Sequence, residues 1–170
     1  GSEFVLRIPL ELSRSQPSDV KQQGRAPVPR RVLIIEDNVD AAQSLRMLLG
    51  FSGHEVEVAY DGPEGIEKAL DFRPEVILCD IGLPDMDGYD VARTLRSDPR
   101  TRDAFLVALS GYALPEDLQR AAAAGFDRHV AKPPHPERLQ DVLADVPRRQ
   151  HARGGMAAQR SGGAGGRRQD

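Results

Sequence analysis

Acidic, hydroxyl and amine side chains follow four apolar segments of this 170-residue chain, each at the point where the segment ends. Apolar runs of this kind, bounded by turn residues, are typical of strands that are buried on both faces of a sheet. Between the runs, apolar residues recur with helical spacing. The polar groups that follow the runs are, in chain order, Glu36-Asp37, Asp80, Ser110 and Lys132.

The alternation of strand-like and helical segments predicts a βα repeat with a parallel sheet. Right-handed crossovers bring the carboxyl ends of such strands to one edge of the sheet, where open α/β folds bind their ligands. We therefore expect three carboxylates, one hydroxyl and one ammonium group to meet there. Such a set is typical of a reaction centre and not of a structural core.

The order and spacing of these side chains resemble those of response-regulator receiver domains. The resemblance covers about residues 30 to 146, and its segments are most similar to receivers attached to hybrid histidine kinases. It implies a flavodoxin-like, doubly wound, five-stranded parallel sheet of order 2-1-3-4-5 with five helices. The segments that carry the resemblance are Glu36-Asp37, Asp80, Leu83-Pro84-Asp85-Met86-Asp87-Gly88, Ser110 and Lys132-Pro133.

The clustered carboxylates predict a divalent cation, because they would repel one another without one. Hard oxygen ligands in a half-open site suit Mg²⁺, or alternatively Mn²⁺. We expect Asp37 and Asp80 to bind the ion directly and Glu36 to bind it directly or through water. The resemblance adds the backbone carbonyl of Gly82 as a ligand. It also implies that Asp80 is the phosphoacceptor, whose carboxylate attacks a phosphohistidine and forms an acyl phosphate.

The amine and the hydroxyl have separate expected roles. Lys132 would offset the charge of the transferring group, which suits a mobile point charge. The hydroxyl of Ser110 can donate to a phosphoryl oxygen, and its movement would bias a protein-docking surface. In the family, an aromatic residue three positions before the lysine follows that movement. This chain has His129 at that position, and we expect the imidazole to swing inward on phosphorylation.

Two other functions compete with that of a phosphoacceptor. A hydrolase of the haloacid-dehalogenase kind also combines Asp, Ser or Thr and Lys with Mg²⁺, but it needs a second acid where this chain has Gly82. A receiver fold that works only by docking would not require the intact acids and Lys132. We expect this segment to be no enzyme beyond its own phosphorylation and dephosphorylation, and its parent polypeptide to be a hybrid histidine kinase.

The expected core faces follow the apolar spacing of the helices. Strands are expected over residues 32–35, 55–59, 76–80, 105–109 and 128–131. The helix after the first strand is expected to bury Ala41, Leu45, Leu48 and Leu49, and the alanine-rich helix after Pro115 is expected to bury Leu118, Ala121, Ala122 and Gly125.

The flanking segments, 1–12, 13–30 and 147–170, differ in composition from the predicted domain over 31–146. Residues 1–12 alternate like a strand, and they are either a cloning scar or, as we favour, the last strand of a truncated kinase ATP-binding domain. Residues 13–30 are polar and proline-containing and are expected to be a linker. Residues 147–170 are rich in Arg and Gly and contain no aromatic residue, so we expect a disordered tail.

The charge and composition of the chain narrow the range of possible binding partners and cellular compartments. The chain carries a net charge of −3, but its tail holds six Arg and one Asp, so residues 1–146 are clearly acidic and do not favour a nucleic-acid surface. A single cysteine and the lack of any long apolar run favour the cytoplasm. We expect a phosphohistidine domain as partner, in the same polypeptide or in a histidine phosphotransfer protein. We also expect no DNA-binding domain, and a weak dimer through the fourth helix, fifth strand and fifth helix.

Overall fold

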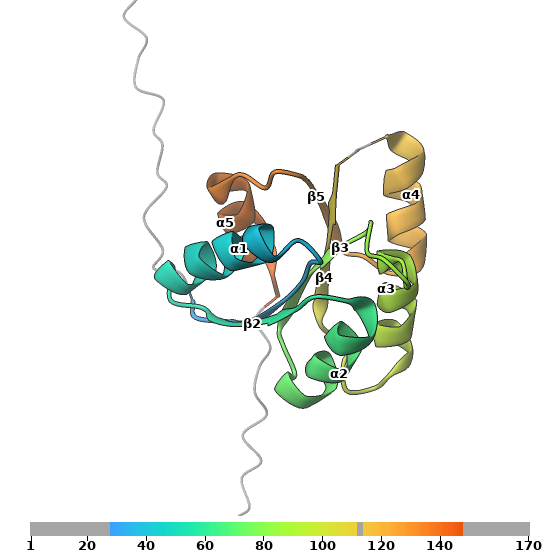
Figure 1. Cartoon of the computed structure of the whole chain (residues 1–170), viewed down its shortest axis with the longest axis horizontal. Helices are drawn as coiled ribbons and strands as arrows, with labels where there is room; N and C mark the ends of the chain where they lie inside the picture. The colour runs from blue at the N-terminus through green and yellow to red at the C-terminus, as the bar shows by residue number, and fades with distance from the viewer. Residues whose placement is uncertain (1–27, 112–113, 148–170) are drawn as a thin grey trace, which may run out of the picture.

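The computed structural model describes residues 28–111 and 114–147, in which strands and helices alternate from end to end (Figure 1). The elements are β1 (Arg31–Ile35), α1 (Val39–Phe51), β2 (Glu55–Ala59), α2 (Gly62–Phe72), β3 (Val76–Asp80), α3 (Gly88–Ser97), β4 (Phe105–Ser110), α4 (Pro115–Ala124), β5 (Arg128–Ala131) and α5 (Pro136–Asp145). None of these helices combines the length and the apolar character needed to cross a bilayer.

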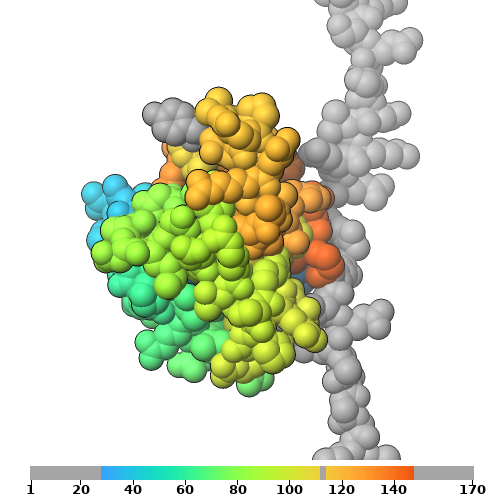
Figure 2. Space-filling view, turned by 90° about the vertical axis from the view of Figure 1, so that its right-hand side faces the viewer, coloured from blue at the N-terminus to red at the C-terminus, as the bar shows by residue number. Residues whose placement is uncertain are grey.

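The five strands form one parallel sheet of order β2-β1-β3-β4-β5. Helices α1 and α5 cover one face, and α2, α3 and α4 cover the other (Figure 1). Helices α3 and α4 pack side by side on the second face (Figure 2). This doubly wound arrangement confirms the predicted flavodoxin-like fold, including the edge position of β2.

Alternating side chains of each central strand enter the two cores. In β1, Val32 and Ile34 pack toward α1 and α5, whereas Leu33 and Ile35 pack toward α2 and α3. Each fully buried aliphatic side chain of this size contributes about 1.5–3 kcal/mol through the hydrophobic effect. The continuous apolar runs of β1, β3 and β4 therefore hold the strand ends in fixed register, which places the polar residues that follow them.

Two predicted core faces were only partly right: Leu45, Leu49 and Ala121 are buried as predicted, but other residues of these faces are not. In α4 the buried residues are Ala121 and Ala124, while Leu118 is 41% exposed and Ala122 is exposed. In α1 the buried alanine is Ala42 and not Ala41. A run of alanines gives no contrast between a large apolar face and a polar face, so the sequence does not define how the helix is rotated.

The flanking predictions lie almost entirely outside the described residues. The strand expected over 1–12, the linker over 13–27 and the tail over 148–170 are not described by the structure. Those boundaries therefore stay predictions.

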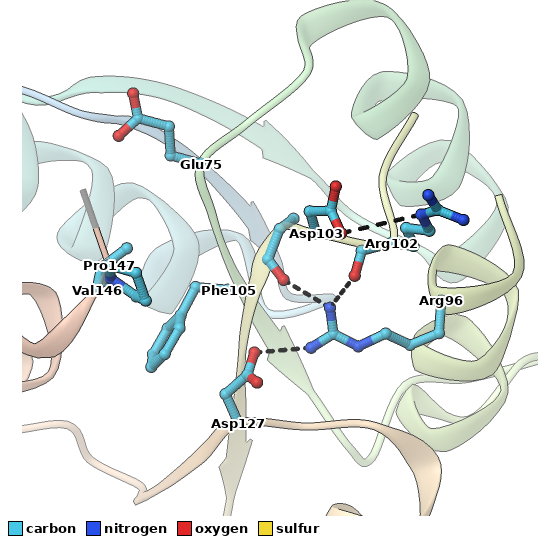
Figure 3. Close-up of a pocket in the computed structure, with 9 residues that line it drawn as sticks. Glu75, Arg96, Arg102, Asp103, Phe105, Asp127, Val146 and Pro147 are labelled. Carbon is cyan, nitrogen blue, oxygen red and sulfur yellow. Dashed lines mark hydrogen bonds and ion pairs between the residues drawn. The ribbon is translucent and has the colours of Figure 1, made fainter. Parts of the chain in front are cut away.

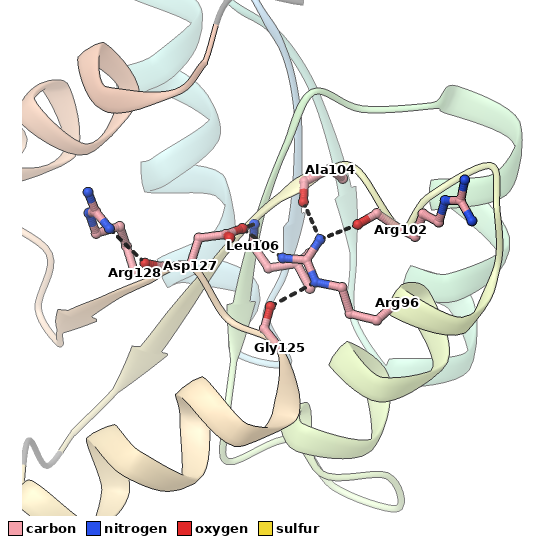
Figure 4. A network of polar contacts seen from close by, with 7 residues as sticks. All are labelled: Arg96, Arg102, Ala104, Leu106, Gly125, Asp127 and Arg128. Atoms are coloured by element: carbon pink, nitrogen blue, oxygen red, sulfur yellow. Dashed lines mark hydrogen bonds and ion pairs between the residues drawn. The ribbon is translucent and has the colours of Figure 1, made fainter.

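At the amino edge of the sheet, the guanidinium of Arg96 joins α3 to the segments around it (Figure 4). Its Nε donates to the carbonyl of Gly125 at 2.8 Å, and its Nη1 donates to the carbonyls of Arg102 and Ala104. Its Nη2 donates to Asp127 Oδ2 at 2.7 Å. One side chain thus fixes the loop after α3 and the turn before β5.

The carboxylate of Asp127 extends this network into β4, because Oδ2 also accepts from the backbone N–H of Leu106 at 2.8 Å. A hollow of about 290 Å³ lies beside the network, bordered by Phe105, Asp127 and Pro147 (Figure 3). Its charged groups are already paired, since Arg96 binds Asp127 and Arg102 lies 3.9 Å from Asp103.

A second arginine ties the two ends of the described domain together at the same edge. The buried Arg30 pairs with Glu75 at 3.1 Å and donates from Nη2 to the carbonyl of Val146 at 2.8 Å. Its backbone N–H donates to His54 Nδ1 at 3.2 Å. The residue before β1 is therefore held against the residue after α5.

Candidate active site at the carboxyl edge of the sheet

Asp80 is the last residue of β3 and lies at the centre of the carboxyl edge. It is only 7% exposed, because β1 and β4 flank its strand. The backbone N–H of Gly82 donates to its Oδ1 at 2.9 Å, and that of Ile81 donates to the carbonyl of Leu109 at 3.0 Å. The turn after β3 therefore holds the carboxylate in a defined orientation.

Glu36 and Asp37 follow β1, the strand beside β3. Glu36 is buried and its N–H donates to the carbonyl of Ala59, whereas Asp37 is exposed. One carboxylate oxygen from each of Glu36, Asp37 and Asp80 lies within 4.8 Å of the others. Residues 36, 37 and 80 thus meet, as the strand order predicts.

Lys132 reaches this acidic cluster from the residue after β5. Its Nζ lies 2.6 Å from Glu36 Oε2 and 2.8 Å from Asp80 Oδ2. Its backbone N–H donates to the carbonyl of Ser110 at 2.8 Å and so continues the pairing of β4 with β5. The ammonium therefore lies between two acids that are 44 residues apart in the chain.

Burial dominates the electrostatics of Glu36. It raises the pKa of Glu36, and the hydrogen bond and charge of Lys132 oppose this only in part. Burial also disfavours the charge of Lys132, but the hydrogen bonds to Asp80 and Glu36 outweigh it, so the pKa of Lys132 is raised. The site holds three carboxylates, and Lys132 pairs with only two of them, Glu36 and Asp80, which leaves negative charge uncompensated.

This donor set fits a divalent metal ion. Carboxylate oxygens are hard ligands, and the exposed Asp37 leaves the cluster open to solvent on one side. A cation at this position would also favour the ionised form of the buried Glu36.

Ser110 and His129 lie on the neighbouring strands β4 and β5. Ser110 Oγ is 2.7 Å from His129 Nε2, and both side chains are half-buried. The imidazole thus already contacts the hydroxyl, whereas the predicted inward swing of His129 on phosphorylation is untested.

The list of candidate residues from the sequence missed Gly88, the first residue of α3. A Cβ at this position would lie 2.3 Å from the carbonyl oxygen of Asp80 and 2.7 Å from the Cα of Ile81. The N–H of Gly88 donates to the carbonyl of Ile81 at 3.0 Å. Only glycine permits this close approach of α3 to the turn that holds Asp80. The available signal was the Asp87-Gly88 pair, in which Asp87 caps α3.

A hollow beside the site also went unpredicted. It has a volume of about 500 Å³ and lies between α1 and the segment that follows β5. Apolar side chains and the polar groups of the active site share its wall. The residues that line it include Asn38, Ala41, Ser44, Leu48, Lys132 and Pro133.

A sequence model of the response regulator receiver domain matches residues 32–144. The chain belongs to this family. It is a receiver domain of the kind found in two-component response regulators, which confirms the resemblance to receiver domains and leaves the hydrolase alternative without support.

Curated receiver proteins show the same relationship. The chain is 32% identical over 106 residues to the polar-differentiation response regulator DivK of Brucella anthropi. The matched region covers 62% of this chain and 86% of DivK. The chain is also 38% identical over 119 residues to the cell cycle response regulator CtrA of Brucella ovis. The matched region covers 70% of this chain but only about half of the length of CtrA.

Solved receiver structures resemble this one closely. Chemotaxis protein CheY4 of Vibrio cholerae is 30% identical with a TM-score of 0.67, covering 71% of this chain and all of that one. The receiver domain of sensor histidine kinase PA1611 from Pseudomonas aeruginosa is 29% identical with a TM-score of 0.65, covering 70% of this chain and 98% of that one. That structure has a magnesium ion coordinated in its active-site cleft.

Proposed function

We propose that this receiver accepts a phosphoryl group from a phosphohistidine onto Asp80. The observation that carries the proposal is the position of Lys132 Nζ, 2.8 Å from Asp80 Oδ2, beside three carboxylates within 4.8 Å of one another. An aspartate nucleophile needs this environment, because the transferring group brings further negative charge to an acidic site.

In the proposed reaction, a carboxylate oxygen of Asp80 attacks phosphorus and forms an acyl phosphate. The phosphorus–nitrogen bond of the phosphohistidine breaks, and its electron pair returns to the leaving imidazole. The N–H of Gly82 orients Asp80 through Oδ1. Lys132 can exchange its contact with Asp80 for one with a phosphoryl oxygen, since its ammonium is a mobile point charge on a flexible stem.

Glu36, Asp37 and Asp80, with the backbone carbonyl of Gly82, would hold Mg²⁺. The ion supplies charge neutralisation for the transferring phosphoryl group when it is bound. Support comes from the fit of the donor set and from the magnesium ion in the PA1611 receiver. The same oxygen ligands would accept Mn²⁺.

The partner we propose is a phosphohistidine domain of a histidine kinase or a histidine phosphotransfer protein. The hollow between α1 and the Lys132-Pro133 segment opens beside the site and would admit the segment that carries the phosphohistidine. The parent polypeptide would be a hybrid histidine kinase of the cytoplasm, which the similarity to the PA1611 receiver supports. The docking surface that responds would comprise α4, β5 and α5, where the exposed Leu118 could also support a weak dimer.

Mass spectrometry after incubation with acetyl phosphate and Mg²⁺ tests the proposal directly. The wild type should gain the mass of one phosphoryl group, and Asp80→Asn should gain none. Asp85→Asn, which changes an exposed acid of the same loop, should be phosphorylated like the wild type. Chelation of Mg²⁺ should abolish the gain. An unmodified wild type in the presence of Mg²⁺ would instead support a receiver that acts by docking alone.

A further inference from the structure

The guanidinium of Arg120, on α4, lies over the first turn of the neighbouring helix α3. Its Cζ is 4.4 Å from the centroid of the Tyr89 ring, which is a favourable distance for a cation–π contact. The ring of Phe126, two residues after α4, meets the same tyrosine edge to face at a centroid distance of 6.5 Å. Tyr89 is only 4% exposed. Arg120 and Phe126 therefore attach the start of α3 to α4.

The carboxylate of Asp87 links the same guanidinium to the N-terminal cap of α3. Its Oδ1 accepts from the backbone N–H of Asp90 at 2.9 Å and so caps the helix. Its Oδ2 lies 3.8 Å from Nη2 of Arg120. One exposed ion pair stabilises little by itself, but here it acts on the same cation as the contact with the tyrosine ring.

The first turn of α3 in turn fixes the backbone around the phosphoacceptor. The N–H of Gly88, the first residue of the helix, donates to the carbonyl of Ile81 at 3.0 Å. The backbones are so close that a Cβ on Gly88 would lie 2.3 Å from the carbonyl oxygen of Asp80. The proposed Mg²⁺ ligands Asp80 and the carbonyl of Gly82 belong to this same turn. A displacement of the start of α3 would therefore displace both ligands.

We propose that Arg120 is a positioning residue for Asp80, acting from α4 through the first turn of α3. Its contacts with Asp87 and Tyr89 hold that turn against the backbone that carries the phosphoacceptor. The part of the inference that concerns Mg²⁺ and phosphoryl transfer rests on the proposed function. Arg120 itself makes and breaks no bond in the reaction, and its effect is on the alignment of the groups that do.

Amide hydrogen exchange, measured by NMR without Mg²⁺, tests the positioning directly. The N–H of Gly88 reports whether the first turn of α3 stays on Ile81. Arg120→Met should make this amide exchange about fivefold faster, because one stacking contact and one ion pair are lost. The side chain of Arg120 is 61% exposed, so this substitution leaves the core intact. Unchanged exchange at Gly88 would overturn the proposal.

Arg128→Met is the matched control, because Arg128 makes the same two kinds of contact elsewhere. Its Cζ lies 6.0 Å from the centroid of the Phe105 ring, and its Nη2 lies 3.5 Å from Asp145 Oδ2. It is the first residue of β5 and therefore lies at the opposite edge of the sheet from Asp80. This variant should leave the exchange of Gly88 within about twofold of wild type. Equal acceleration by both substitutions would indicate a general loss of stability and overturn the proposal.

A double-mutant cycle tests whether Arg120 acts through Asp87. Asp87→Asn keeps a good N-cap for α3 but removes the charge that faces the guanidinium. In the Asp87→Asn background, Arg120→Met should accelerate the exchange of Gly88 only about twofold, because the contact with Tyr89 is then the main one lost. An undiminished effect would place the action of Arg120 elsewhere and contradict the proposal.

Mg²⁺ binding gives a readout that a merely structural contact would not change. Mg²⁺ needs nearly ideal ligand geometry, so calorimetry should show about threefold weaker binding to Arg120→Met. Phosphorylation by acetyl phosphate should need correspondingly more Mg²⁺ for half saturation. At saturating Mg²⁺ the bound ion holds its ligands in place, so the rate should stay within about twofold of wild type. Wild-type Mg²⁺ affinity in Arg120→Met would refute the inference.

Failure of this inference and failure of the proposed function are distinguishable. The exchange of Gly88 and the binding of Mg²⁺ are measured without a phosphodonor. If both respond to Arg120→Met but the wild type is never phosphorylated, the proposed function fails and the positioning role of Arg120 stands. If the wild type is phosphorylated and neither measurement responds, the inference alone is wrong.

Discussion

The two edges of the sheet each place one cation among acceptors, but in opposite ways. At the amino edge, Arg96 donates to three backbone carbonyls and to Asp127 (Figures 3 and 4). At the carboxyl edge, Lys132 faces two carboxylates, Glu36 and Asp80. Most partners of the first cation are backbone carbonyls that the fold holds in place, whereas both partners of the second are carboxylates, whose protonation and ligands can change.

This difference matches the chemistry of the two side chains. The planar guanidinium presents donors in a fixed fork, which suits carbonyls that the fold has already positioned. The ammonium is a compact charge on a flexible stem and can move to a new oxygen without changing its own geometry. The amino edge is therefore built to hold a structure, and the carboxyl edge is built to exchange partners. The predictions below test that division.

Removing the cation at the carboxyl edge should have the largest effect. We expect Lys132→Ala to slow phosphorylation by acetyl phosphate about 100-fold or more, because a donor to the developing charge is lost. In Mg²⁺ buffer, Lys132→Ala should lower the free energy of unfolding by a smaller amount than Arg96→Met does. Quench-flow or gel assays measure the rate. The control is Lys68→Ala, which removes an ion pair with Glu64 on α2 and should leave the rate unchanged. A phosphorylation rate of Lys132→Ala close to that of the wild type would remove the functional half of the comparison.

Removing the cation at the amino edge should instead lower stability. Arg96→Met should reduce the free energy of unfolding by about 2–3 kcal/mol, because carbonyls and the carboxylate of Asp127 lose their donor. Urea denaturation measures this loss, and phosphorylation of the folded variant should stay within about twofold of wild type. Arg93→Met, on the exposed face of the same helix, should change stability by less than about 0.5 kcal/mol. A slow but fully stable Arg96→Met would contradict the division.

Gly88 offers a change that should affect both properties at once. Gly88→Ala places a Cβ against the backbone of Asp80, so we expect a loss of about 2 kcal/mol in stability and about tenfold slower phosphorylation. Gly50→Ala is the matched control, because no atom lies within 4 Å of its added Cβ. That control should stabilise α1 by up to about 1 kcal/mol. Equal stability of the two alanine variants would show that the turn after β3 can relax.

The smallest effect should come from His54 at the amino edge. Burial and the charge of Arg30 lower the pKa of His54, so the folded protein binds this proton less tightly than the unfolded chain. Its contribution to stability is complete above the unfolded pKa, near 6.5, and is lost as the pH falls below it. The melting temperature of wild type should therefore fall more between pH 8 and pH 5.5 than that of His54→Gln. Parallel pH profiles would exclude this linkage.

The sequence predicted the sheet and the meeting of its polar residues because both depend on strong local patterns. Continuous apolar runs define buried strands, and the polar residue after each run must lie at the shared edge. Contacts that depend on exact distances could not be predicted in this way. Gly88 is required because any Cβ at its position would collide with the backbone of Asp80. The hydrogen bond between His129 and Ser110 depends on the rotamers of both side chains. The rotation of α4 was missed because its alanines give no contrast between faces.

The hydrogen bond from Arg30 to Val146 determines where other segments of a polypeptide could be joined to the domain. Residues 116 positions apart are joined by one hydrogen bond on the side of the molecule away from Asp80. Anything attached before residue 30 or after residue 146 would therefore start from a common base. The carboxylate cluster lies at the opposite edge of the sheet, so a phosphoryl donor would approach it from the side away from both attachment points.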